Sequence, residues 1–173
     1  MNILAAFKPI KLFTLDVDGV LTDGSLLVMN DGQLVRRMNI KDGYALQLAI
    51  KKGYHILVIS GGYSDAVKMR LEKLGVTNVF IGVLHKTAVL HQYMQEHDFQ
   101  KNEVLYMGDD MPDIAVMQMA GLPCCPADAV AEIKDISNYI SPIKGGEGCV
   151  RDIIEKVLKL NAHWHDDGNT PSK

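Results

Sequence analysis

The regular alternation of short apolar runs with helical segments, from residue 11 to residue 160, constrains the fold of this chain most. The apolar runs have strand length, and the segments between them have the length and apolar spacing of helices. We expect strands at residues 11–16, 54–59, 78–81, 103–107, 122–124 and 138–140, and helices at residues 42–52, 63–74, 86–97, 111–119, 128–135 and 148–160. Such alternation favours an α/β fold with a doubly wound parallel sheet, Rossmann-like, in three α/β/α layers with right-handed crossovers.

One segment departs from the alternation. Residues 25–38 predict a β-hairpin insert that turns at Asn30-Asp31-Gly32. The chain has 173 residues and 47% hydrophobic content, which fits a single domain with its own core, expected over residues 1–160. Residues 161–173 are rich in His, Asp, Gly, Asn, Pro and Ser, so we expect a flexible tail or a segment held only by a partner.

Composition argues against several classes of protein. The net charge is −3 and no basic block is present, so we expect no nucleic-acid partner. The apolar stretch Ile3–Phe7 is too short for a secretion signal and no run approaches the ~20 apolar residues of a membrane span, so we expect a cytoplasmic protein without membrane contact. Cys124, Cys125 and Cys149 have neither disulfide-framework nor metal-site spacing, and we interpret them as reduced packing residues.

Two acidic residues, Asp16 and Asp18, directly follow the first apolar run. In open α/β sheets ligands bind at the carboxyl ends of the strands. Two carboxylates held close to each other and to an apolar core repel one another and lose hydration unless a cation neutralises them. Mg²⁺ suits such oxygen ligands and keeps positions for water and substrate phosphate. An Asp-x-Asp-Gly sequence also fits a simple turn, so this segment alone does not decide between the two.

The next strand end and a later helix start carry groups that can bind phosphate. Ser60-Gly61-Gly62 follows the second apolar run and offers a hydroxyl and bare backbone amides, although the same residues can merely form the turn before a helix capped by Ser64 or Asp65. Lys86 lies at the start of a helix, where a cation opposes the helix dipole, so its position suggests a compensating anion nearby. A solvated surface lysine is the simpler alternative.

The strand expected at residues 103–107 is followed by three carboxylates in five residues: Asp109, Asp110 and Asp113. One of them, Asp110, can serve only as a helix cap. Three anions at one strand end exceed the need for a cap, and they predict a metal site.

Together these segments resemble a known family. Asp16-Val17-Asp18-Gly19-Val20, Ser60, Lys86 and Gly108-Asp109-Asp110-Met111-Pro112-Asp113 match, in order, the four motifs of the haloacid dehalogenase-like phosphatases. The resemblance covers about residues 10–160. Asn39-Ile40-Lys41-Asp42-Gly43 and Gly145-Gly146-Glu147-Gly148 are similar to its capless subfamily, the 3-deoxy-D-manno-octulosonate 8-phosphate phosphatases of lipopolysaccharide synthesis.

The resemblance implies a role for each matched residue. Asp16 would be the nucleophile that forms an aspartyl-phosphate, and Asp18 would protonate the leaving alcohol and then activate water. Ser60 and Lys86 would bind the phosphoryl oxygens. Mg²⁺ would be the cofactor, held by Asp16, the backbone carbonyl of Asp18, and Asp109, with Asp110 or Asp113 supporting that shell and positioning Lys86.

Motif spacing bears on how the site is closed. Only 41 residues separate Asp18 from Ser60 and 25 separate Ser60 from Lys86, and the expected elements already use them, so there is no room for a cap domain. An open site holds a small sugar poorly. Capless relatives form tetramers in which neighbours close the site, so we expect a homotetramer. The apolar hairpin residues would pack on a neighbour or, equally, on their own domain: Leu26, Leu27, Val28, Leu34 and Val35.

Substrate choice depends on residues that match the family less well. We expect Gly61, Gly62, Arg70 and Asp42 to contact a phosphorylated sugar-acid substrate. The octulosonate phosphatases usually carry arginine where this chain has Gly62, which removes a possible bidentate contact. Arg70 could replace it, or could form a surface ion pair. A nine-carbon ketodeoxy sugar acid 9-phosphate is therefore the rival substrate, and a weakly active oligomerisation domain is the rival function.

Overall fold

The computed structural model describes residues 3–165 and 168–171. Its centre is a six-stranded sheet in the order β5-β4-β1-β6-β7-β8, and every neighbouring pair is parallel. The strands are β1 (Leu12–Leu15), β4 (His55–Ile59), β5 (Asn78–Phe80), β6 (Val104–Met107), β7 (Leu122–Cys125) and β8 (Tyr139–Ile140). The predicted doubly wound α/β fold is confirmed.

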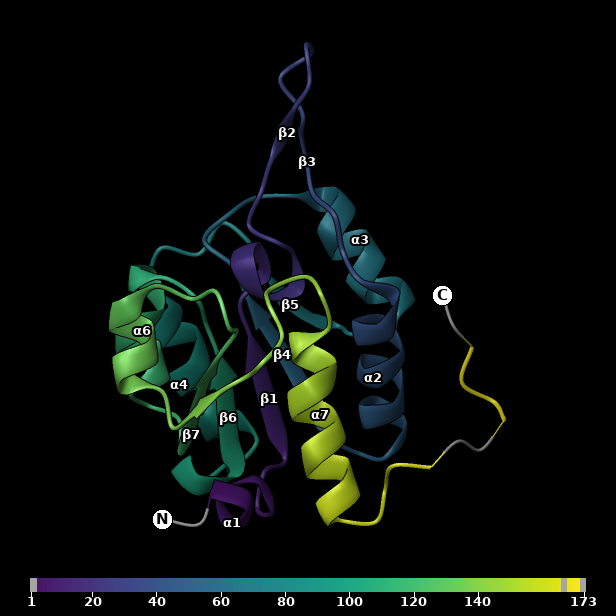
Figure 1. The fold of residues 1–173 in the computed structure, drawn as a ribbon, viewed down its shortest axis with the longest axis vertical. Helices are drawn as coiled ribbons and strands as arrows, with labels where there is room; N and C mark the ends of the chain where they lie inside the picture. Colours follow the sequence, from purple (N-terminus) through teal and green to yellow (C-terminus); the bar gives the residue numbers. More distant parts are fainter. Residues whose placement is uncertain (1–2, 166–167, 172–173) are drawn as a thin grey trace.

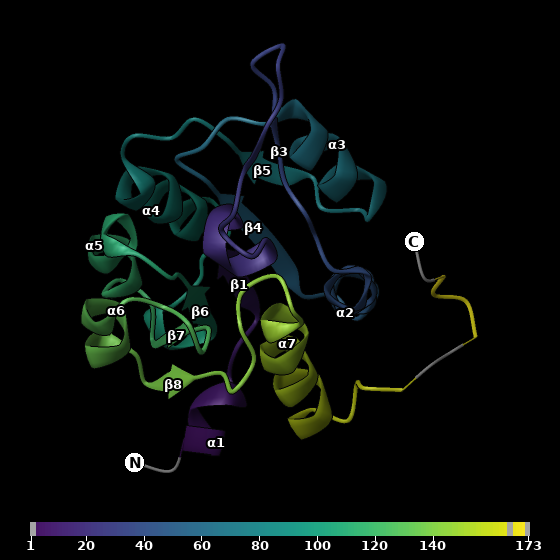
Figure 2. The same cartoon turned by 45° about the horizontal axis from the view of Figure 1, so that its top comes forward.

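Helices cover both faces of this sheet (Figures 1 and 2). One layer holds α1 (Ile3–Phe7), α2 (Ile40–Lys51), α3 (Asp65–Lys73) and α7 (Cys149–Leu160), and the other holds α4 (Lys86–Glu96), α5 (Ile114–Met117) and α6 (Ala131–Ile136). Alternate residues of β1 face opposite layers: Phe13 packs in the cluster with α2 and α7, and Leu12 in the cluster with α4. A strand buried on both faces explains why the sequence reads as a continuous apolar run.

Four helices begin two or three residues away from the predicted positions, and one of them, α3, begins at Asp65 after its cap Ser64. α2 begins at Ile40 because the Asn39 side chain accepts a hydrogen bond from the backbone N–H of Lys41 at 2.8 Å and caps the helix two residues early. The helix expected at 111–119 was too long: a 3₁₀ turn, Met111–Asp113, precedes the short α5. α6 starts three residues later than expected, because residues 127–128 form a turn and Val130, directly before the helix, is extended.

The predicted hairpin projects from the body above the carboxyl ends of the strands (Figure 1). Its strands, β2 (Leu27–Val28) and β3 (Leu34–Val35), are antiparallel. Gly32 has a φ of +86°, and the backbone N–H of Met29 donates to the carbonyl of Gln33 at 2.9 Å, so the turn lies where the sequence predicted it. Leu27 and Val28 are 64% and 70% exposed, so these apolar side chains do not pack on their own domain.

The described part of the carboxy-terminal segment contacts the domain. Trp164 packs edge-on against Tyr44 of α2, and His163 Nδ1 lies 2.9 Å from the hydroxyl of Tyr54. The prediction of a segment held only by a partner was therefore wrong for these residues, whereas its flexibility stays a prediction. Cys124, Cys125 and Cys149 are all buried and free, as predicted. Within residues 3–165 and 168–171, no helix has the length and apolar character needed to span a membrane.

Candidate active site

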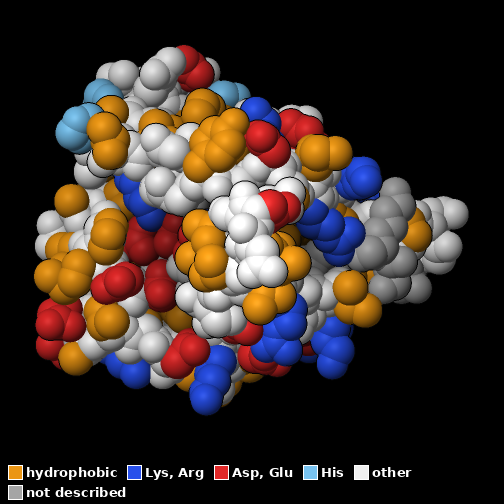
Figure 3. Space-filling model, turned by 90° about the horizontal axis from the view of Figure 1, so that it is seen from above, with side chains coloured by type: hydrophobic (Ala, Val, Ile, Leu, Met, Phe, Trp, Pro, Cys, Tyr) orange, Lys and Arg blue, Asp and Glu red, His pale blue; other side chains and the backbone are white. Residues whose placement is uncertain are grey.

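The carboxyl ends of β1, β4 and β6 meet at one edge of the sheet and surround a cavity of about 350 Å³. Figure 3 looks down on this edge and shows acidic side chains gathered in a hollow beside the hairpin. Most of the residues singled out from the sequence line the cavity: Asp16, Asp18, Ser60, Gly61, Gly62, Lys86, Asp109, Asp110 and Asp113. The four motifs, up to 97 positions apart in the chain, therefore form one site.

The backbone turns sharply after β1, and the site depends on that turn. Asp16 leaves the strand and is followed by one wide helical turn, Val17–Leu21, in which Gly19 has a φ of +88°. A Cβ atom on Gly19 would lie 1.9 Å from Oδ2 of Asp109. The absence of a side chain at Gly19 lets the loop after β6 approach the loop after β1, which brings Asp16 and Asp109 together.

Lys86 lies between two carboxylates. Its ammonium Nζ is 2.9 Å from Oδ1 of Asp16 and 2.8 Å from Oδ1 of Asp113, and all three side chains are buried. Asp113 Oδ1 also accepts a hydrogen bond from the Tyr106 hydroxyl at 2.8 Å, and its Oδ2 accepts one from the backbone N–H of Asp109 at 3.2 Å. Asp113 is thus held by three donors and fixes Lys86 toward Asp16. These contacts supply the anions that the sequence suggested for a lysine at a helix start.

Burial and charge shift the acid–base properties of this cluster. The pKa of Asp16 is raised to about 6, first by burial and then by the charge of Asp113. The pKa of Asp109 is raised to about 8 by burial and by the charges of Asp16, Asp113 and Asp110. Burial alone lowers the pKa of Lys86, but the charges of Asp16 and Asp113 outweigh it and raise the value. The protein by itself therefore disfavours full ionisation of its carboxylates near neutral pH.

The donor set fits a divalent cation. One oxygen from each of Asp16, Asp109 and Asp113 lies within 4.8 Å of the others, and Lys86 balances only one of the three charges. Asp113 already accepts from three donors, so Asp16 and Asp109 are the better direct ligands. Hard oxygen ligands with an open cavity on one side match the preferences of Mg²⁺, which would restore the ionised form of both carboxylates.

Asp18 has a partner that the sequence analysis missed. Arg36, which follows β3 at the base of the hairpin, donates from Nε to Asp18 Oδ1 at 2.6 Å and from Nη2 to Oδ2 at 3.2 Å. Such a two-point contact fixes the carboxylate as well as pairing its charge. The available signal was Arg36-Arg37 at the end of a hairpin inserted directly after the two carboxylates, but a hairpin gives no indication of which way its arginines point.

The phosphate-binding candidates after β4 form a tight turn. Ser60 is buried and its Oγ accepts a hydrogen bond from the backbone N–H of Gly62 at 3.1 Å. Ser64 caps α3 through the backbone N–H of Val67, so this segment forms the turn before a capped helix that the simpler alternative described, while Ser60 also lines the cavity. Asp110, in contrast, accepts from the backbone N–H of Met111 at 2.7 Å and caps the turn after β6, as the structural alternative foresaw.

Two predicted substrate contacts lie elsewhere. A Cβ on Gly43 would be 3.1 Å from Nη2 of Arg70, so this guanidinium lies against α2, and it lines a separate cavity under the hairpin. Asp42 is buried and accepts a hydrogen bond from the backbone N–H of Arg151 at 2.7 Å. It therefore caps the start of α7, where Gly148 offers no side chain to do so. Neither residue lines the cavity that holds Asp16.

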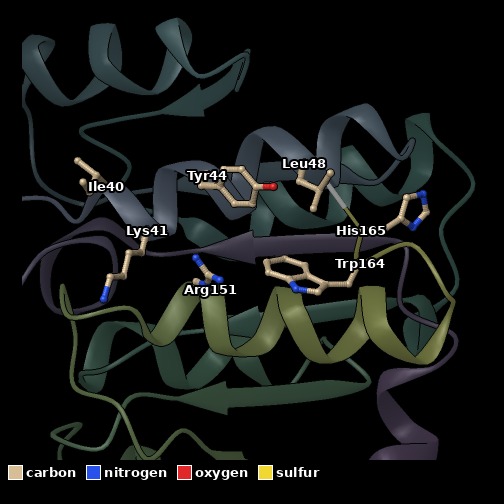
Figure 4. Close-up of a pocket in the computed structure, with 7 residues that line it drawn as sticks. All are labelled: Ile40, Lys41, Tyr44, Leu48, Arg151, Trp164 and His165. Carbon is tan, nitrogen blue, oxygen red and sulfur yellow. The ribbon is translucent and has the colours of Figure 1, made fainter. Parts of the chain in front are cut away.

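A larger cavity, about 680 Å³, lies between α2 and α7 (Figure 4). Arg151 sits there between two rings, with its guanidinium carbon 5.8 Å from the centre of the Tyr44 ring and 5.2 Å from that of Trp164. Among residues 3–165 and 168–171, those that line it include no carboxylate and no residue of the four motifs. The smaller cavity at the strand ends is therefore the better candidate for chemistry.

Comparisons with known proteins agree with this assignment. A family model described as haloacid dehalogenase-like hydrolase matches residues 78–153. The chain is 31% identical over 157 residues to the 3-deoxy-D-manno-octulosonate 8-phosphate phosphatase KdsC of Escherichia coli (strain K12). The matched region spans 91% of this chain and 84% of that protein.

Solved structures of similar proteins share the whole fold. A 3-deoxy-D-manno-octulosonate 8-phosphate phosphatase from Yersinia pestis matches with a TM-score of 0.91 and 28% identity, covering 99% of this chain and 91% of that chain. The enzyme from Moraxella catarrhalis, in complex with magnesium ion, phosphate ion and KDO, matches with a TM-score of 0.87 and 30% identity, covering 91% of each chain.

Proposed function

Because the chain belongs to the haloacid dehalogenase-like hydrolases, we propose that it is a Mg²⁺-dependent phosphatase that hydrolyses 3-deoxy-D-manno-octulosonate 8-phosphate. The products would be 3-deoxy-D-manno-octulosonate and phosphate. One observation carries this proposal: Lys86 Nζ lies between Asp16 and Asp113 at the strand ends, beside Asp109, so a nucleophilic carboxylate, a cation and candidate metal ligands share one site. The match to the Escherichia coli phosphatase extends over 84% of that protein, so the similarity includes nearly the whole enzyme and supports the same activity.

Asp16 acts as the nucleophile. Its carboxylate attacks phosphorus and forms an aspartyl-phosphate, so one slow hydrolysis is divided into two faster steps. Lys86, 2.9 Å from this carboxylate, places a positive charge beside the position that the phosphoryl oxygens would occupy. Ser60, Gly61 and Gly62 line the same cavity, and the Ser60 hydroxyl and the backbone amide of Gly61 can bind the remaining oxygens.

Asp18 moves the protons. It gives a proton to the oxygen of the leaving sugar as the phosphorus–oxygen bond breaks, and it then takes a proton from the water that attacks the aspartyl-phosphate. Acid–base catalysis of this kind contributes roughly 10²–10⁴-fold. Asp16, Asp109 and the backbone carbonyl of Asp18 would hold Mg²⁺, which when bound supplies positive charge against the transferring phosphoryl group.

The exposed hairpin supports a homotetramer. Its apolar residues are 43–70% exposed: Leu26, Leu27, Val28, Met29, Leu34 and Val35. A projecting apolar patch of this kind is typical of a contact surface. In our proposal a neighbouring subunit covers these side chains and closes the cavity at the strand ends, which has no cap domain of its own. The enzyme would then act in the cytoplasm in lipopolysaccharide precursor synthesis.

A substrate panel tests the proposal. Phosphate release is measured with eight- and nine-carbon sugar-acid phosphates, with and without Mg²⁺, and the mass of the protein is measured in solution. We expect turnover that requires Mg²⁺, the highest kcat/KM for the eight-carbon substrate, and a tetramer. Preference for the nine-carbon substrate would change the assigned substrate, and a tetramer without turnover would favour the oligomerisation domain.

A further inference from the structure

The base of the hairpin contributes a charged side chain to the active site. Arg36 forms two hydrogen bonds with Asp18, through Nε at 2.6 Å and Nη2 at 3.2 Å, and its third nitrogen donates to the carbonyl of Leu34 at 3.2 Å. All three nitrogens of the guanidinium therefore have partners. The carboxylate and the guanidinium are held in one relative orientation.

Burial of the guanidinium makes this pair unlike an ordinary surface ion pair, while Asp18 stays 34% exposed. The Arg36 side chain is only 5% exposed, and Asp18 is the one carboxylate with which it forms an ion pair among the residues that the structure describes. Arg37, the next residue, is 67% exposed and pairs with Asp23 and Glu147. A buried guanidinium depends on its partner far more than an exposed one does.

Gly62 leaves the space that the pair occupies. A Cβ atom at this position would lie 2.6 Å from Oδ2 of Asp18 and 3.1 Å from Nη2 of Arg36. Ser60 Oγ would be 3.5 Å away. The pair therefore sits directly beside the turn that is expected to bind the phosphoryl group, and a side chain at Gly62 would push it aside.

We propose that Arg36 is a positioning residue that holds the Asp18 carboxylate in place for proton transfer. This inference rests on the proposed function, since it assigns Asp18 as the acid–base group. When Asp18 gives its proton to the leaving oxygen, the negative charge that remains on its carboxylate is met by the guanidinium already in contact with it. When the carboxylate takes a proton from water, it starts from the same fixed orientation. Arg36 itself neither gains nor loses a proton.

Kinetics of four variants test this role. Arg36→Met keeps the aliphatic length but removes the charge, and Arg37→Met is the matched control one residue away. Asp18→Asn removes the acid–base group, and the double variant combines it with Arg36→Met. Turnover is measured with the eight-carbon sugar-acid phosphate and with p-nitrophenyl phosphate, and thermal unfolding of every variant is recorded.

We expect Arg36→Met to lower kcat about 10–100-fold with little change in KM, because it disturbs a group that contributes roughly 10²–10⁴-fold. Arg37→Met should keep wild-type kcat. The double variant should be no slower than Asp18→Asn alone, since groups that act as a unit are not additive. Arg36→Lys, which keeps the charge but loses the two-point contact, should recover only part of the loss.

Three results would overturn the role of Arg36: unchanged kcat in Arg36→Met, a rise in KM alone, or losses that multiply in the double variant. If Arg36→Met does not fold, Arg36→Gln, which keeps hydrogen-bond donors but removes the charge, takes its place, and its loss of kcat should likewise vanish in the Asp18→Asn background. Absence of turnover in the wild type with both substrates would instead contradict the proposed function itself.

Discussion

Asp16 at the strand ends and Asp42 between α2 and α7 are both buried carboxylates whose pKa is raised to about 6, in each case first by burial. Their surroundings differ. Asp16 contacts Lys86, lies within 4.8 Å of two further carboxylates and faces a cavity. Asp42 accepts from a backbone N–H of α7, and its other oxygen is buried without a hydrogen-bond partner.

The difference shows that a raised pKa alone does not identify a catalytic carboxylate. Asp42 loses hydration on burial, but it accepts a hydrogen bond from a backbone N–H at the start of α7, which is a structural role. Asp16 is combined with a cation, other anions and open space, and that combination has no structural use. The cavity of about 680 Å³ between α2 and α7 supports the same point, because its described lining residues include no carboxylate despite its size.

The strongest test exchanges the charge at each position for an amide of the same shape. Asp16→Asn should lower kcat by at least about 10⁴-fold, because an amide cannot serve as the nucleophile. Asp42→Asn should keep kcat within a few-fold of the wild type, since its oxygen can still accept from the backbone N–H of Arg151. Phosphate release and thermal unfolding are measured for both variants.

If Asp16→Asn and Asp42→Asn both fold and lose activity equally, the distinction between the two carboxylates is wrong, and Asp42 would again be a candidate substrate contact. Full activity in Asp16→Asn would contradict its role as nucleophile. Retained far-ultraviolet circular dichroism in both variants is the control that separates lost chemistry from lost folding.

The sequence predicted the sheet, and which polar residues meet at its carboxyl edge, because both depend on local patterns. Each strand is a continuous apolar run, and the polar residues that follow it, such as Asp16 and Ser60, must meet at one edge once the strands are parallel. The family resemblance was confirmed for the same reason, since its motifs are short and ordered along the chain.

Contacts between distant elements could not be predicted. Asp42 lies 109 positions from Arg151, and only the packing of α2 on α7 brings its carboxylate to the start of that helix. The contact of Trp164 with Tyr44 depends on where the chain turns after α7. Arg36 reaches Asp18 because of the angle of the hairpin, which its alternating residues do not specify.

A smaller effect should appear in the dependence of stability on pH and Mg²⁺. The pKa of Asp16 is raised to about 6 and that of Asp109 to about 8, above the ordinary value of 3.8. The protonated forms of Asp16 and Asp109 therefore stabilise the fold fully below about pH 4. This stabilisation is lost as the pH rises through about 6 and then about 8. Mg²⁺ at about 100 times its Kd should add about 2.7 kcal/mol where the site is ionised, so the gain should be larger at about pH 8 than at about pH 5.

Thermal unfolding at both pH values, with and without Mg²⁺, measures this difference. Asp42→Asn is the matched control, because it removes a carboxylate with a similarly raised pKa that lies outside the metal site. That variant should keep the full response to Mg²⁺. An equal Mg²⁺ gain at both pH values would contradict the assignment of Asp16 and Asp109 as ligands.

The smallest expected effect concerns Asp42 itself. Asp42→Ala removes the acceptor for the backbone N–H of Arg151, so it should lower the free energy of unfolding by about 1 kcal/mol relative to Asp42→Asn, which keeps it. The raised pKa of Asp42 means that its protonated carboxyl group stabilises the fold fully below about pH 4 and that this contribution is lost as the pH rises through about 6. Asp42→Asn should therefore gain stability relative to the wild type between those values, as denaturant unfolding at each pH would show. A wild type that instead gained on Asp42→Asn as the pH rose would mean that the ionised carboxylate is favoured at the start of α7, and Asp42 would then differ from Asp16 in the sign of its charge effect as well as in its partners.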